Sequence, residues 1–143
     1  MTRIRGAIVG AAIGCAPFAI ALTFRQDNMG IPWPVAASIP AGVIAGAAVG
    51  GWIRSNEPVR YRVVFGGALI ADLVGVVVVS IGAAIDASAG PYPPETPLPV
   101  TILGFTALGL LSWGWFAYVP LAILAFIGGL LVRGWNERDA SRD

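Results

Sequence analysis

The amino-acid sequence predicts an all-α integral membrane protein: a bundle of four transmembrane helices, two of them glycine-striped, with an additional apolar segment on the outer side. Apolar residues make up 57% of the 143 positions and charged residues only 12%, against about 25% in an ordinary soluble domain. The charged residues cluster and leave four almost uncharged runs of 19, 26, 23 and 37 residues. About 20 apolar residues cross the hydrocarbon core of a bilayer, so each run is long enough for one span.

These runs define a single membrane domain, residues 1–143. The first run is also compatible with a signal peptide, but it continues without a charge past Cys15 to Phe24, which favours a retained helix. The predicted spans are residues 5–24, 35–54, 62–85 and 113–133, with a proline-rich outer loop at 86–99 and a short, frayed cytoplasmic tail at 134–143.

The last uncharged run, between Glu95 and Arg133, holds either one span with a surplus or two short spans. The arginines decide between them, because cytoplasmic loops of membrane proteins are enriched in Lys and Arg. Four spans place eight of the nine arginines inside and leave Arg25 alone outside, whereas five spans divide them five to four. We therefore expect a multi-pass protein of the cell membrane with both termini in the cytoplasm. Residues 98–112 are then a half-inserted helix, a re-entrant segment or the top of a long tilted helix.

Tryptophans lie near the ends of the predicted spans, at the depth that amphipathic rings prefer. The expected interface anchors are Trp33, Trp113 and Trp115 on the outer side, and Trp52 and Trp135 on the inner side. The loop at 86–99 contains five prolines, which predict an extended and stiff connection.

The composition excludes several classes of function. The chain has no histidine and a single cysteine, so an internal disulfide, a histidine-ligated metal and a histidine-based catalytic triad all lack their parts. The net charge is only +1, which provides no basic surface for a nucleic acid. We expect no enzyme activity, no cofactor, no metal and no nucleic-acid partner.

Two predicted helices carry the same glycine pattern. Residues 6–14 read GAIVGAAIG and residues 42–50 read GVIAGAAVG, so a glycine recurs at every fourth position and forms a flat stripe along each helix. In lipid, helices associate through close backbone approach rather than apolar burial. We expect that the stripes pack against each other, or that one pairs within the chain and the other with a second subunit. The glycines expected at these contacts are Gly6, Gly10, Gly14, Gly42, Gly46 and Gly50.

Asp72 is the only acidic residue in the interior of a predicted span, and a charge at that depth costs about 2.5–3.5 kcal/mol on insertion scales. Helical projection places it on a face of small residues that includes Gly75, so this face is expected to pack inside the bundle or against another subunit. Two interpretations compete. Asp72 either binds a proton, a cation or the positive group of a substrate, or, protonated, donates one hydrogen bond to a carbonyl group of a neighbouring helix.

The favoured function is that of a small, non-catalytic membrane protein. It would act through tight helix packing, as a homo-oligomer or as an accessory subunit of a membrane complex, and the glycine stripes and short loops support this interpretation. The alternative is a small transporter or channel for a proton, a cation or a small substrate, with Asp72 as the binding residue. The expected partners are the lipid bilayer and other membrane subunits.

Overall fold

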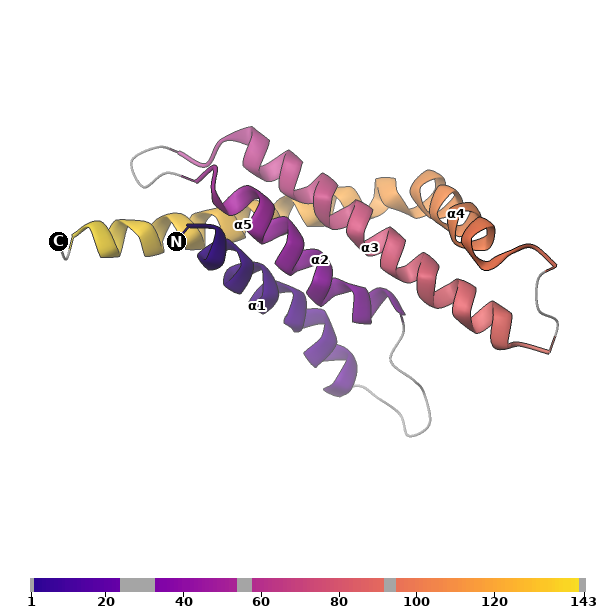
Figure 1. Cartoon of the computed structure of the whole chain (residues 1–143). Coiled ribbons are helices and arrows are strands. Elements are labelled where there is room, and N and C mark those ends of the chain that lie inside the picture. Colours follow the sequence, from indigo (N-terminus) through magenta and orange to yellow (C-terminus); the bar gives the residue numbers. More distant parts are fainter. Residues whose placement is uncertain (1, 24–32, 54–57, 92–94, 142–143) are drawn as a thin grey trace.

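The computed structural model describes residues 2–23, 33–53, 58–91 and 95–141, and every regular element in these ranges is helical. α1 and α2 lie side by side, α3 packs on α2, and the last helices pack against α3 (Figure 1). In chain order the elements are α1 (Thr2–Thr23), α2 (Trp33–Gly50), α3 (Tyr61–Ala89), α4 (Leu98–Gly109), the π-helical turn η1 (Leu110–Gly114) and α5 (Trp115–Ala140).

Among the described residues, two helical segments are long and apolar enough to cross a membrane, Tyr61–Ala89 and Phe116–Ala140. α3 has 29 residues, about 44 Å of helix, which exceeds a hydrocarbon core of roughly 30 Å. The apolar segments Ala36–Gly50 and Leu98–Ser112 are shorter. The length and composition of the two long helices favour a membrane protein.

The predicted loop at 86–99 is too long at both ends. α3 continues through Ala89, and α4 begins at Leu98, so the connection lies between Gly90 and Pro97. A proline at 99 does not prevent α4 from starting, because the first turn of a helix needs no intrahelical amide donor.

Residues 98–112 belong to a helix that is continuous with the last predicted span. The π-helical turn η1 joins α4 directly to α5, and α4 lies beside the C-terminal half of α3 (Figure 1). A Cβ atom at Gly109 would lie 2.8 Å from Cγ1 of Val76, so glycine is what lets α4 approach α3 this closely. This continuity agrees with the last of the three alternatives, the top of a long helix, whose tilt in a membrane stays a prediction.

The expectation of a frayed C-terminal tail is wrong for residues 134–140, which remain helical. Arg5 of α1 donates a hydrogen bond to Oδ1 of Asn136 at 2.6 Å and forms an ion pair with Asp139. Its guanidinium carbon also lies 5.4 Å from the ring centroid of Trp135. These contacts tie the start of α1 to the end of α5, so both lie at the same end of the molecule (Figure 1).

Buried apolar side chains gather at this same end. The cluster consists of Val49, Ile53, Val63 and Val132, with Val9, Val59 and Ile70 packed against it. Farther along α3, the ring of Tyr118 stacks on that of Phe65 with centroids 6.4 Å apart, and the Tyr118 hydroxyl donates a hydrogen bond to the Phe65 carbonyl at 3.2 Å. α4 contributes no buried residue.

Candidate functional site

α1 and α2 meet through their glycines. Gly6 lies against Gly46 and Gly10 against Gly42, and because rising numbers on α1 meet falling numbers on α2, the helices are antiparallel. A Cβ atom added at Gly10 would overlap the carbonyl oxygen of Gly42, and one added at Gly42 would overlap that of Gly10. At this separation the two backbones are close enough for dispersion contacts along the stripe, which a side chain larger than hydrogen would prevent.

The same four-residue register continues at both ends of the contact. Gly14 meets Ser38, whose hydroxyl donates a hydrogen bond to the Gly14 carbonyl at 2.7 Å. At the other end, a Cβ atom on Gly50 would lie 2.8 Å from the carbonyl oxygen of Thr2. The glycines of α1 and α2 thus face each other within one chain, which is the first of the two pairings expected from the sequence.

Asp72 lies on α3, where it faces the π-helical turn η1. It is only 8% exposed. A Cβ atom on Gly114 would lie 3.0 Å from Oδ2 of Asp72. Because glycine has no side chain, the carboxyl group is able to lie close to the η1 backbone. No hydrogen bond joins this carboxyl group to another residue in the described part of the chain, and its oxygen atoms are not fully covered. The interhelical hydrogen bond of the second interpretation is therefore not formed between described residues.

The hydroxyl groups of α3 and α4 that could have paired with Asp72 bond to their own helices. The hydroxyl of Ser80 donates to the carbonyl of Val76 at 2.7 Å, and that of Thr106 to a carbonyl one turn earlier in α4 at 2.8 Å. Gly75 does not have the packing role expected for it within the chain, since a Cβ atom there would meet no atom within 4 Å. The reason is that α4 approaches α3 at Val76, one residue farther round the helix.

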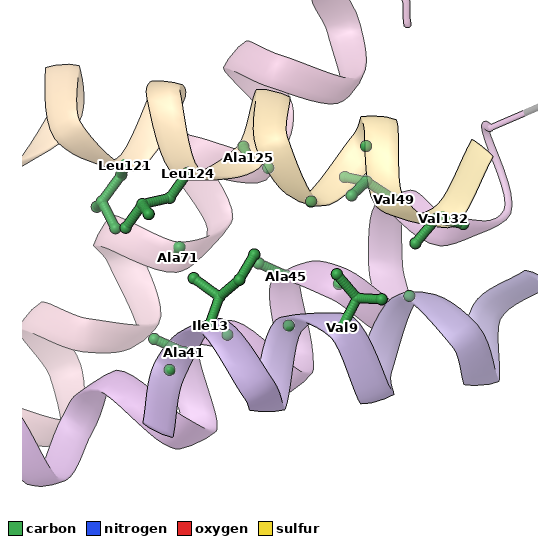
Figure 2. Close-up of a pocket in the computed structure, with 18 of the residues that line it drawn as sticks. Val9, Ile13, Ala41, Ala45, Val49, Ala71, Leu121, Leu124, Ala125 and Val132 are labelled. Carbon is green, nitrogen blue, oxygen red and sulfur yellow. The ribbon is translucent and has the colours of Figure 1, made fainter. Parts of the chain in front are cut away.

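An apolar cavity of about 160 Å³ lies between α1, α2, α3 and α5. Val9 and Ile13 of α1 point across it toward α5 (Figure 2), where both lie close to Gly128. Apart from Ser38, whose hydroxyl is already bonded to α1, the lining side chains are apolar. Asp72 does not line this cavity, so the two features are separate candidates.

Two of the five predicted interface anchors have side chains that the structure describes. Trp52 is 47% exposed and Trp135 is 39% exposed, and the Trp52 ring lies against Gly66. The side chains of Trp33, Trp113 and Trp115 lie outside the described part of the chain, and their expected position stays a prediction.

Two glycines at which α5 packs against its neighbours were not predicted from the sequence. A Cβ atom on Gly128 would lie 3.1 Å from Cδ1 of Ile13, and one on Gly129 would lie 2.9 Å from Cγ1 of Val59. The two glycines are adjacent and therefore serve two neighbours, α1 and the segment that leads into α3. The doublet at 128–129 is the signal that would have pointed to this contact.

No set of three or more Cys, Asp or Glu side chains gathers around a shared metal position in the described ranges. Comparisons of the chain with protein-family models, with curated proteins and with solved structures found no match. In the part of the chain that the structure describes, the fold thus defines the class as a helical protein with two helices long and apolar enough to span a membrane.

Proposed function

We propose that this chain is a four-span integral membrane protein without catalytic activity, which acts through helix packing as a homo-oligomer or as an accessory subunit of a membrane complex. In this proposal both termini face the cytoplasm. The glycine contact between α1 and α2 stabilises the fold of the single chain. The surface that meets lipid or a second subunit is the helix from α4 through α5.

The exposed apolar surface of this helix is the observation that supports the proposal most directly. α4 has no buried residue, and only 11% of the most apolar stretch of α5 is buried. The core helix of a soluble protein would be covered, whereas an apolar surface of this extent calls for lipid or a partner. Its exposed large side chains are Leu98, Val100, Leu103, Leu108, Leu111, Phe116, Val119, Ile123, Leu124, Phe126, Ile127, Leu130 and Leu131.

Counting subunits in bilayers that contain only this chain tests the proposal. Single-molecule photobleaching is expected to show several copies per particle for a homo-oligomer and one copy for an accessory subunit. Phe116→Ala, at a side chain that is 78% exposed on α5, should lower the copy number of a homo-oligomer without loss of helix content. The matched control is Leu69→Ala on α3, at a side chain that is 59% exposed. A chain-dependent ion flux across these bilayers would contradict a purely packing role.

Asp72 supports a second candidate function, a channel or transporter for a proton or a small cation. A buried acid without a bonding partner among the described residues marks a functional site in a membrane protein more often than a structural one. Its neighbour η1 adds support, because π-helical turns are frequent at functional sites.

If this second function holds, Asp72→Asn should abolish proton or Na⁺ flux in proteoliposomes while helix content stays unchanged. Asp86→Asn, at an exposed acid on the same helix, is the control and should retain the flux. A flux that is indifferent to Asp72→Asn would reject this role for the carboxyl group.

A further inference from the structure

We propose that the cavity between α1, α2, α3 and α5 binds the end of a lipid acyl chain. This inference rests on the proposed membrane location. It adds a ligand site to a chain whose proposed role is packing alone, and the ligand is identified by the chemistry of the lining.

The lining excludes water and polar ligands. A buried water molecule needs two to four polar partners. Among the described residues the lining offers one polar side chain, Ser38, whose hydroxyl already donates a hydrogen bond to Gly14. A polar group placed there without a hydrogen bond would lose its hydration with no compensation. The cavity therefore suits a hydrocarbon.

The volume sets the size of the occupant. About 160 Å³ is close to the volume of an engineered apolar cavity, roughly 150 Å³, that stays dry and binds benzene. That space holds the last few carbons of an acyl chain and has no room for a head group.

The cavity lies at the depth of the acyl chains in the proposed arrangement. Leu124 lines the cavity and is 37% exposed, so the lining reaches the outer surface of α5. Ile53, Val63 and Val132 line the cavity near the end of the bundle that holds the chain termini, and Ala71 lines it near the middle of the third predicted span. The cavity therefore extends through one half of the hydrocarbon core, where the acyl chains of one leaflet lie.

The experiment uses the full chain in bilayers of phospholipid with a photoreactive diazirine at the end of one acyl chain. After illumination, mass spectrometry compares labelling of Ile13, which lines the cavity, with labelling of Ile8, which is 51% exposed and does not line it. Both residues are expected to be labelled. In Ala45→Leu, labelling of Ile13 should fall about tenfold, because the added carbons occupy the space of two methylene groups of the ligand.

Ala48→Leu is the matched control on the same helix, at an exposed position outside the lining, and should change neither label. Ala41→Val fills the cavity less and replaces Ala45→Leu if that variant does not fold. Labelling of Ile8 without Ile13 would overturn the inference. Unchanged labelling of Ile13 in both Ala45→Leu and Ala41→Val would also overturn it. Labelling of neither residue would instead show that the chain is not embedded, and the proposed function itself would fail.

Discussion

Gly10→Leu is expected to separate α1 from α2 and to deprive the chain of its native fold. A single Cβ atom at this position already overlaps the carbonyl oxygen of Gly42. Extra methylene groups in a packed core cost about 1–3 kcal/mol where side chains are able to shift. Here the obstructing atoms are backbone, so we expect a loss of free energy of unfolding at or above the top of that range.

Equilibrium unfolding in mixed detergent micelles, followed by helix content, measures this loss. The matched control is Gly104→Leu on α4, because a Cβ atom at Gly104 would meet no atom within 4 Å. That variant should keep its stability or gain up to about 1 kcal/mol from the better helix former. If Gly10→Leu unfolds at the same detergent fraction as Gly104→Leu, the glycine contact does not hold the fold.

Asp72→Ala is expected to raise the free energy of unfolding by up to about 3 kcal/mol, the upper penalty for a buried polar group that has no hydrogen-bonding partner. The expectation follows from the surroundings of the carboxyl group. It is buried against Gly114 and has no hydrogen-bonding partner among the residues that the structure describes. Removing it therefore relieves a desolvation penalty and breaks no bond in that part of the chain.

The same unfolding measurement decides whether Asp72 is structural. An interhelical hydrogen bond in a membrane is worth roughly 1–2 kcal/mol. A destabilisation of that size in Asp72→Ala, with Glu95→Ala at an exposed acid unchanged, would restore the structural interpretation. A gain in stability would mean that the Asp72 carboxyl group lowers the free energy of unfolding. Groups that serve a function commonly destabilise the fold in this way.

The helices follow from the sequence because their determinants are local. Charged residues bound each apolar run, and the four-residue spacing of glycine fixes which face of α1 and α2 is flat. That spacing does not reveal the partner of each stripe, since a flat face accepts any helix. The partner is fixed by the register in which Gly10 meets Gly42 and Gly14 meets Ser38.

The remaining features depend on contacts between distant parts of the chain. Arg5 and Asp139 are 134 residues apart. The sequence around either residue does not indicate that the two pair, so the contact that holds the end of α5 in helical form could not be predicted. The π-helical turn at 110–114 has an ordinary apolar sequence. The sequence alone therefore could not decide among the three alternatives for the structure of residues 98–112. The cavity arises from the combined volumes of side chains on four helices, which no single segment encodes.

The sidedness of the two chain ends tests the four-span arrangement most directly. Single cysteines at Thr2, Glu95 and Ser141, each in a Cys15→Ala background, would be probed in intact cells with a thiol reagent that does not cross membranes. We predict labelling of the cysteine at 95 alone, with those at 2 and 141 reacting only after the membrane is opened. Labelling of position 2 and position 141 from opposite sides would contradict the arrangement, because an even number of spans returns both ends to the cytoplasm.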